Sequence, residues 1–187
     1  MEEFWSYHPG IFSDIKLEEV LKECGKLLSS QRVYKGQEKM VSRFSCVFAT
    51  SKREARKKLP SYDDMQFYRW HASPTTLAIK NRLEEIVGHS FDYVLLHHYV
   101  DGTASIGYHN DNESLDGEVA SVSIGQKRKF RIRNFDETSG YIKEFLLGGG
   151  DLLIMKKGMQ RKYKHGIPKE LKIKSGRLNW TFRSYQE

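Results

Sequence analysis

Short segments with the pattern of β-strands follow one another through the second half of the chain, and they restrict its fold more than any other feature. From Phe91 onward, apolar residues alternate with polar ones or form short runs, separated by turn signals such as "DG", "DETSG" and "LGGGD". The segments are FDYVLLHHYV, ASIGYH, EVASVSIG, KRKFRIRNF, YIKEFLL, DLLIMKK, RKYKHGI and RLNWTFRSY. Such a succession favours a double-sheet jelly roll (a double-stranded β-helix), although alternation alone does not separate it from another barrel or sandwich.

Two amphipathic segments precede these strands. Residues 13–30 predict a helix capped by Ser13, with apolar residues at helical spacing, namely Leu17, Val20, Leu21, Cys24 and Leu28. Residues 73–90 predict a second helix, capped by Ser73, with Pro74 in its first turn and Gly88 at its end. Its buried stripe would be Ile79, Leu83, Ile86 and Val87. We expect both helices to pack on one sheet, which gives an α+β, mainly β fold class.

Length and composition predict one domain over residues 1–187. The chain is 39% hydrophobic and 29% charged, and no run approaches the roughly 18 apolar residues of a membrane span. The start, MEEFWSYHPG, lacks the basic head and apolar middle of a secretory signal. The two cysteines, Cys24 and Cys46, form neither a disulfide framework nor a zinc-site spacing. We therefore expect a monomer in a reducing intracellular compartment, the nucleus or cytoplasm, with no membrane partner.

A net charge of +7 and a pI near 9.3 are compatible with a polyanionic partner and equally with plain solubility. One basic cluster lies within residues 52–58 and comprises Lys52, Arg53, Arg56, Lys57 and Lys58. The other lies in the segment KRKFRIRNF. As a strand, this segment places Lys127, Lys129, Arg131 and Arg133 on one face, and Arg128, Phe130 and Ile132 on the other. The basic face would contact phosphates or water.

A histidine and two acids are crowded together where the strand-like segment ASIGYH ends. His109 and Asp111 are two positions apart, so an extended chain points both side chains the same way. His165 is the only histidine after His109 and lies 56 positions later, in the segment RKYKHGI. Two imidazoles and one carboxylate on one face of an octahedron suit iron(II) that activates oxygen, although zinc or manganese can occupy the same ligands. The sequence therefore predicts a metal site formed by His109, Asp111 and His165.

The last strand-like segment carries polar residues at every second position. Arg177, Asn179, Thr181 and Arg183 share one face of RLNWTFR, opposite Leu178, Trp180 and Phe182. Oxygen-activating iron enzymes commonly draw electrons from 2-oxoglutarate, a dicarboxylate, and an arginine fork gives a carboxylate two parallel charge-assisted bonds. These arginines are therefore candidate ligands for 2-oxoglutarate, with a structural salt bridge as the alternative role.

The motifs IKNRLEEIVGHSFDYVLLHHYVDG, SIGYHNDNESL, ASVSIGQKRKFRIR, GGGDLLIMKKGMQRKYKHGIPKE and GRLNWTFR appear in order over about residues 75–185. In these motifs the chain resembles the AlkB family of iron(II)- and 2-oxoglutarate-dependent dioxygenases, most closely its animal nucleic-acid repair branch. The first 70 or so residues match only loosely. The resemblance implies Fe(II), 2-oxoglutarate and O2 as cofactor and cosubstrates. It also implies oxidative demethylation of N-alkylated bases of the 1-methyladenine and 3-methylcytosine type, with release of formaldehyde and succinate.

The same resemblance assigns residues to roles. It implies His109, Asp111 and His165 as catalytic iron ligands, and Tyr99, Arg177, Asn179 and Arg183 as 2-oxoglutarate ligands, with Thr181 nearby. Two positions depart from the family. His97 stands where asparagine is usual, and its imidazole can still donate to a carboxylate. Asn112 stands where the repair branch often has an aspartate that helps to read the base, which would shift substrate preference.

A base in a duplex cannot reach such a pocket, so we expect the enzyme to act on single strands or to flip the nucleotide of alkylated DNA or RNA. Residues 1–75 would form an N-terminal helix and a substrate-recognition lid, and residues 76–187 a helix and the catalytic jelly roll. Arg53 and Lys57, in the basic run, would hold the backbone. Asn112 and Glu113 would lie near the base, or Glu113 would support the metal ligands. Candidate stacking residues are Phe44, Phe48, Phe67, Tyr68, Trp70 and Tyr108.

Two other functions remain open from the sequence. One is a 2-oxoglutarate-dependent hydroxylase of a protein or a small molecule on the same scaffold. The other is a nucleic-acid-binding module with impaired catalysis, which the departures at His97 and Asn112 suggest.

Overall fold

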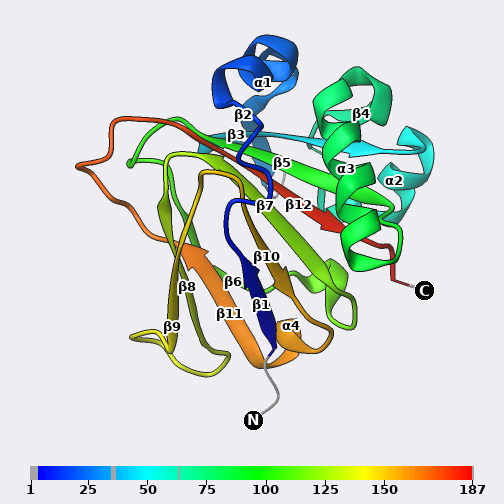
Figure 1. The fold of residues 1–187 in the computed structure, drawn as a ribbon. Coiled ribbons are helices and arrows are strands. Elements are labelled where there is room, and N and C mark those ends of the chain that lie inside the picture. Colours follow the sequence, from blue (N-terminus) through cyan, green and yellow to red (C-terminus); the bar gives the residue numbers. More distant parts are fainter. Residues whose placement is uncertain (1–3, 35–36, 63, 187) are drawn as a thin grey trace.

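The structure, a computed structural model, describes residues 4–34, 37–62 and 64–186. Within these ranges, two β-sheets pack face to face, and helices cover the outer face of the larger sheet (Figure 1). The predicted mainly β, double-sheet fold class is confirmed. All eight strand-like segments from Phe91 onward form strands in the structure.

The larger sheet contains eight strands among the described residues. Seven lie in the order β1 (Trp5–His8), β10 (Asp151–Met155), β7 (Val119–Gly125), β12 (Arg177–Arg183), β5 (Tyr93–Tyr99), β3 (Gln37–Ala49) and β2 (Ser29–Tyr34). All these neighbours are antiparallel, whereas β4 (Phe67–Arg69) pairs in parallel with the end of β3. Strand β12 has a partner on each side, and every one of its residues is buried. Its polar side chains therefore lie inside the molecule.

In the described part of the chain, the smaller sheet has four strands in the order β6 (Ile106–His109), β11 (Tyr163–Ile167), β8 (Arg128–Asn134) and β9 (Lys143–Leu147). Apolar residues from both sheets meet between them. The buried members of this layer are Tyr99, Ala104, Val119, Phe130, Ile132, Leu147, Leu153, Met155, Met159 and Ile167. Burial of this layer is what holds the two sheets together.

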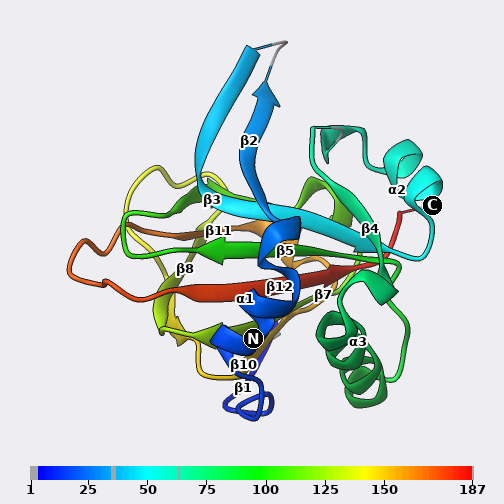
Figure 2. The same ribbon diagram turned by 90° about the horizontal axis from the view of Figure 1, so that it is seen from above.

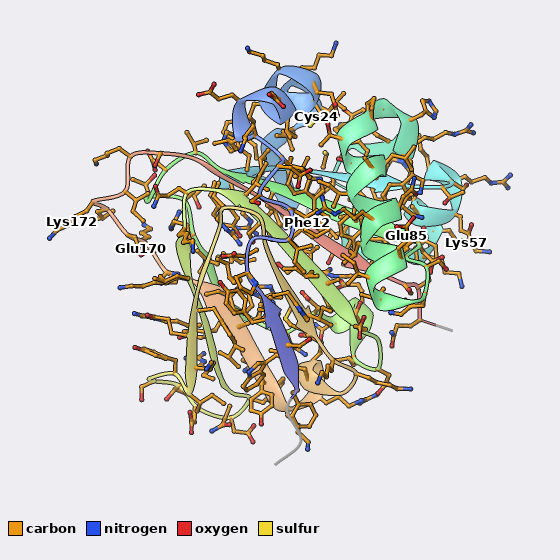
Figure 3. The ribbon with its side chains drawn as sticks, in the orientation of Figure 1. Phe12, Cys24, Lys57, Glu85, Glu170 and Lys172 are labelled. Atoms are coloured by element: carbon orange, nitrogen blue, oxygen red, sulfur yellow. The ribbon has the colours of Figure 1, made fainter. Side chains whose placement is uncertain are left out.

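Two helices, α1 (Leu17–Cys24) and α3 (Pro74–Val87), lie on the same face of the larger sheet, as the view from above in Figure 2 shows. Val20 and Cys24 of α1 and Ile79 and Leu83 of α3 join a core cluster with the outward-facing sheet residues. Phe12, labelled in Figure 3, belongs to the same cluster. The prediction that helices pack on one sheet is confirmed.

The expected ends of α3 are confirmed, but α1 is shorter at both ends than the predicted residues 13–30, since it ends at Cys24 and β2 begins at Ser29. Ser73 Oγ accepts a hydrogen bond from the amide of Thr76, and Gly88 ends α3 in the left-handed conformation. In contrast, α1 begins only at Leu17, because Ser13 lies in a turn and donates its amide to Gly10 O. Ile86, expected in the buried stripe of α3, is 43% exposed.

Between α1 and α3, two parts of the polar, basic and aromatic stretch 31–72 form neither surface strands nor loops. The last residues of β3, Ser45–Ala49, are buried because β5 and β4 flank them in the sheet. After β3 come a helix, α2 (Lys52–Lys58), and short 3-10 helices at Pro60–Tyr62 and Trp70–Ala72. Ala55 and Leu59 pack with Val47, Leu95 and other residues, so α2 covers one end of the inner face of the larger sheet.

Strand β8 has the two faces that its alternation predicts. Arg128, Phe130 and Ile132 are buried, whereas Lys129, Arg131 and Arg133 are partly exposed. The buried Arg128 donates to Asp101 O, Ala104 O and Pro168 O and pairs with Glu170 at 2.9 Å. It thereby joins two loops at the end of the jelly roll away from α2.

The first 75 residues contribute β1, β2, β3 and β4 to the same sheet as the later strands. Their division from residue 76 onward into a lid and a catalytic core stays a prediction. Among the helices that the structure describes, none combines the length and the apolar character needed to cross a bilayer.

Candidate metal and cosubstrate site

The two predicted histidine ligands lie opposite each other on neighbouring strands. His109 ends β6, and the antiparallel register of β6 and β11 pairs it with His165. Their ring centroids are 4.4 Å apart. His109 Nδ1 lies 2.9 Å from Gly107 O, so this nitrogen carries the proton and Nε2 keeps its lone pair for a ligand. The His165 ring stacks on Phe130, which fixes its plane.

Asp111 joins the histidines from the loop just after β6. Its carboxylate is 3% exposed, with Oδ1 3.6 Å from His109 Nε2 and Oδ2 3.8 Å from His165 Nε2. The loop is fixed by Gln160 in α4 (Met159–Lys162), whose Oε1 accepts the Asp111 amide at 3.0 Å. The backbone carbonyl of Gln160 also accepts a hydrogen bond from Asn110 Nδ2. Gln160 therefore sets the position of the ligand loop from a separate element.

Burial and nearby charges determine the protonation of two members of the cluster, His165 and Asp111. Burial lowers the pKa of His165 to about 3, so its imidazole is neutral at physiological pH. Burial alone would raise the pKa of Asp111, but the Arg183 guanidinium 2.8 Å away outweighs it, and the pKa of Asp111 is lowered. Metal ligation needs neutral imidazole and ionised carboxylate, and these are the forms that the site favours.

The residues present fit a divalent transition metal. One ligand atom from each of His109, Asp111 and His165 lies within 4.8 Å of the others. Asp111 Oδ2 is buried and has no hydrogen-bond partner, which a bound cation would compensate. Two imidazoles and one carboxylate match the set that holds iron(II) in oxygenases, although the donors alone also suit zinc or manganese.

A polar pocket adjoins the cluster. It is lined by His97, Tyr99, Ile106, His109, Ser121, Phe130, Met155, His165, Ile167, Asn179, Thr181 and Arg183. Three of the polar residues predicted on β12 therefore face it, and Leu178, Trp180 and Phe182 lie in the opposite core, as expected. The Asn179 amide donates to Ser121 Oγ at 2.8 Å and to Ser123 Oγ at 3.2 Å, and its Oδ1 accepts from Thr181.

Arg177 is buried beside this pocket and opposite Tyr99 in the β12–β5 register. Its Nε donates to Leu147 O and its Nη2 to Ser123 Oγ, but its Nη1 is buried without a partner. Burial lowers the pKa of Arg177 to about 10, so it still carries its charge at neutral pH. A buried cationic donor without an acceptor fits the distal carboxylate of 2-oxoglutarate.

His97 also faces the pocket, paired across the strands with Asn179. Its Nδ1 lies 2.6 Å from Ser45 Oγ, on the buried end of β3. When the Ser45 hydroxyl donates this bond, the proton of His97 is on Nε2. An imidazole in this state can donate to a carboxylate, as the asparagine common in the family can. Ser45 was not identified from the sequence, because it lies 52 residues away with no local pattern.

Arg183 connects the metal cluster with the chain outside the jelly roll. Its Nη2 lies 2.8 Å from Asp111 Oδ1, and its Nη1 donates to the Tyr62 hydroxyl at 2.8 Å. Tyr62 and Ser61 in turn donate to the carboxylate of Glu113, which lies in a short 3-10 helix (Asn112–Ser114). The structure therefore places Glu113 beside the metal ligands, bonded to protein groups, and Tyr62 is a residue that the sequence did not suggest.

The candidate stacking residues are divided between core and surface. Phe48, Phe67 and Trp70 are at most 8% exposed and belong to core clusters, so the structure leaves none of them a free ring face. Tyr68 is half-buried, with Lys52 Nζ 5.9 Å from its ring centre, and Phe44 is 39% exposed. Tyr108 directly precedes His109, is half-buried and carries Arg133 over its ring at 4.0 Å.

The remaining substrate candidates are at the surface. Asn112 is exposed next to Asp111, and together with Glu113 it lines a second pocket beside Leu59. Arg53 and Lys57 are exposed on α2, and Figure 3 shows Lys57 pointing away from the sheets. The structure thus places Asn112 and Tyr108 near the metal cluster and the two cations on an outer helix.

Comparison with known proteins agrees with this geometry. Residues 5–183 match the 2OG-Fe(II) oxygenase superfamily. A similar chain is the uncharacterized protein R406 of Acanthamoeba polyphaga mimivirus, 40% identical over 115 residues, which are 59% of this chain and 59% of that protein. Alpha-ketoglutarate-dependent dioxygenase alkB homolog 3 of Bos taurus is 36% identical over 62% of this chain and 43% of its own length. DNA oxidative demethylase ALKBH2 of Bos taurus is 31% identical over 59% of this chain and 43% of its own length.

Among solved structures, "The structure of OsALKBH1" matches 98% of this chain and 99% of its own, with a TM-score of 0.67 and 18% identity. At that identity the match shows a shared fold. The chain spans between about two fifths and three fifths of the length of the curated relatives described above.

Proposed function

The chain belongs to the 2OG-Fe(II) oxygenase superfamily, whose members use Fe(II), 2-oxoglutarate and O2, and on this basis we propose that it oxidatively demethylates N-alkylated bases in DNA or RNA. The bases would be of the 1-methyladenine and 3-methylcytosine type, and the products would be formaldehyde, succinate and the restored base. One observation carries the proposal: His109, Asp111 and His165 converge beside the buried polar face of β12.

Each residue of the site has a role in this proposal. His109, Asp111 and His165 would hold Fe(II), which together with 2-oxoglutarate and O2 supplies the oxidant for the methyl group. Arg177 Nη1 would bind the distal carboxylate of 2-oxoglutarate, with Tyr99 beside it. His97, Asn179 and Thr181 would complete the polar wall of the pocket. The apolar residues Ile106, Phe130 and Ile167 exclude water from the wall opposite.

Two basic surfaces support a nucleic-acid substrate. The first is α2, where Lys52, Arg53, Arg56, Lys57 and Lys58 are all exposed. The second is the outer side of the smaller sheet, where cations lie over aromatic rings: Arg131 over Tyr141, Arg133 over Tyr108 and Lys164 over Phe135. Cations beside partly exposed aromatic rings are typical of nucleic-acid-binding surfaces, where the cations bind phosphates and the rings stack on unpaired bases. Two relatives support a nucleic-acid substrate by their names: one is called an alkB homolog and the other a DNA oxidative demethylase.

The test is a panel of single- and double-stranded DNA and RNA oligonucleotides carrying 1-methyladenine or 3-methylcytosine. Each is incubated with protein and scored by mass spectrometry for base repair, with and without Fe(II) and 2-oxoglutarate. We expect repair and formaldehyde release that depend on both additions and that disappear in His109→Ala. Succinate formation that ignores every oligonucleotide would instead indicate a hydroxylase of a protein or small molecule.

A different outcome would favour the remaining alternative, a nucleic-acid-binding module with impaired catalysis. Oligonucleotide binding that is equal in the wild type and in His109→Ala, without repair by either protein, would indicate a nucleic-acid-binding module.

A further inference from the structure

The segment between β3 and β4 reaches the metal cluster through two consecutive side chains. It contains α2 and the short 3-10 helix that ends at Tyr62, and Ala55 of α2 packs against the larger sheet. Ser61 Oγ donates to Glu113 Oε1 at 2.5 Å, and the Tyr62 hydroxyl donates to Glu113 Oε2 at 3.0 Å. This segment is therefore attached to the loop that carries Asp111.

The Tyr62 hydroxyl lies between two groups of opposite charge. It accepts a hydrogen bond from Arg183 Nη1 at 2.8 Å while it donates to Glu113. The same guanidinium places Nη2 2.8 Å from Asp111 Oδ1. Burial raises the pKa of Tyr62, so the hydroxyl keeps the proton that it donates.

Without this hydroxyl, the two carboxylates would compete for one guanidinium. Arg183 Nη1 and Glu113 Oε2 are 4.0 Å apart, at the outer limit of an ion pair. A small rotation of the Arg183 fork would bring it into direct contact with Glu113, and the same rotation would draw Nη2 away from Asp111. The Tyr62 hydroxyl bonds both Arg183 and Glu113. Because Glu113 already receives hydrogen bonds from Tyr62 and Ser61, a direct contact with Arg183 would add little stability, and the rotation is not favoured.

We propose that Tyr62 is a positioning residue of the metal site, which keeps Arg183 on Asp111 by satisfying Glu113 in its place. The proposal rests on the proposed metal centre and adds to it a residue from outside the jelly-roll strands. Asp111 then presents its remaining oxygen, Oδ2, toward the histidines in a fixed orientation. Groups that orient metal ligands in this way typically change metal affinity by about 10- to 100-fold when they are removed.

The test measures binding of Mn(II), which is stable in air, to metal-free protein by calorimetry. Tyr62→Phe removes the hydroxyl and keeps the ring, and we expect it to weaken Mn(II) binding by about 10-fold. Tyr7→Phe, a change of the same size on the distant edge strand β1, serves as the matched control and should bind Mn(II) as the wild type does. Melting curves of the metal-free proteins check that both variants fold.

A second variant separates positioning from a general loss of packing. Glu113→Gln removes the charge that competes for Arg183 but keeps an oxygen that accepts hydrogen bonds. We therefore expect Tyr62→Phe/Glu113→Gln to regain Mn(II) affinity to within about 3-fold of the wild type, a strongly non-additive result for neighbouring sites. A purely structural role of Tyr62 gives no such rescue.

The outcomes are distinguishable. If the wild type binds no Mn(II), the proposed function fails and this inference with it. If the wild type binds and Tyr62→Phe binds equally well, or if the double variant stays as weak as Tyr62→Phe, the inference alone is wrong.

Discussion

At the scale of single residues, the most informative atoms are buried polar atoms that lack a partner. Asp111 Oδ2 and Arg177 Nη1 are both of this kind. The first belongs to the metal cluster, and the second belongs to a residue paired with Tyr99, which lines the adjoining pocket. Leaving such groups unpaired costs about 1–3 kcal/mol each, and more when they are charged. Their presence is explained when a cation meets the first and a carboxylate meets the second.

Arg177 provides a direct test of the cosubstrate site. Arg177→Lys keeps the charge but loses the fork, so the side chain can no longer bond Leu147 O and Ser123 Oγ while it offers a further donor to a carboxylate. We expect the KM for 2-oxoglutarate to rise by about 10- to 100-fold, which corresponds to the loss of one charged hydrogen bond of about 1.5–3 kcal/mol. Mn(II) affinity without 2-oxoglutarate should stay unchanged. An unaltered KM would show that Arg177 is a structural arginine.

His165 should make the metal-free protein sensitive to acid. Its pKa is about 3 in the folded chain and 6.5 in the unfolded chain, so between these two pH values the unfolded state binds this proton more than the folded state does. The free energy of unfolding therefore falls as the pH falls, by about 2 kcal/mol between pH 6.5 and 5. Urea unfolding with a chelator present should show this fall in the wild type and in His71→Gln, an exposed-histidine control. His165→Gln should lack this part of the fall, and equal slopes in all three proteins would contradict the assignment.

Single residues were predictable where chemistry and short spacing coincide. His109 and Asp111 lie two positions apart, and Arg177 and Arg183 share one strand face, so local alternation sufficed to group them. Gln160, Ser45 and Tyr62 were not predictable, because each acts through a contact with a residue at least 49 positions away. Glutamine, serine and tyrosine at such positions look like any polar surface residue in the sequence.

At the scale of elements, the start of α3 is secured by more than one bond. Ser73 Oγ accepts from the amide of Thr76 and donates to Glu23 Oε1 in α1 at 2.6 Å. Glu23 further accepts from the amide and hydroxyl of Thr75. The cap of α3 therefore also joins the two helices that cover the larger sheet.

Ser73→Ala should accordingly cost more than an ordinary cap. We expect it to lower the free energy of unfolding by about 2 kcal/mol, because it removes both the buried cap of the Thr76 amide and the bond to Glu23. Ser51→Ala, which removes the single exposed cap bond of α2 to Glu54, should cost about 1 kcal/mol or less. Urea denaturation compares the two variants. Equal losses would mean that the bond to Glu23 contributes nothing.

The strands from Phe91 onward were predictable because each is short, apolar on one side and bounded by turns. The segment before α3 was harder. From Lys52 to Leu59, only Ala55 in α2 and Leu59 just after it belong to a core cluster. The apolar stripe of α2 is therefore too narrow to stand out from the basic residues around it. Burial at the end of β3 depends on β4 and β5, which no pattern within β3 itself reveals.

At the scale of the whole molecule, positive charge is present on several faces, and its effect on nucleic acid depends on where it lies. Helices α1 and α2 occupy different sides of the structure (Figure 1). Both carry exposed lysines or arginines, but α2 belongs to the segment between β3 and β4 that contacts Arg183 through Tyr62.

A charge comparison therefore tests the predicted backbone contact. Lys52→Gln/Arg53→Gln/Lys57→Gln on α2 should weaken binding of a single-stranded oligonucleotide and reduce the slope of log K against log salt by about 2, since each phosphate contact contributes about 0.7. The control, Lys16→Gln/Lys22→Gln/Lys26→Gln on and beside α1, changes the same charge. Fluorescence anisotropy over a salt series measures both. Equal slopes in the two triple variants would place the contact elsewhere.

The pairing of His109 with His165 on one antiparallel ladder has a consequence for how such a chain can change over time. The loops between the two positions can gain or lose residues without moving either imidazole, since the ladder and not the intervening length sets their separation. The register already shifts between His165 and Ile167, so a further insertion between this shift and either histidine would turn one ring to the opposite side of the sheet. Length variation among descendants of this gene should therefore concentrate in the connecting turns, and the two short ladder segments should keep a constant residue count.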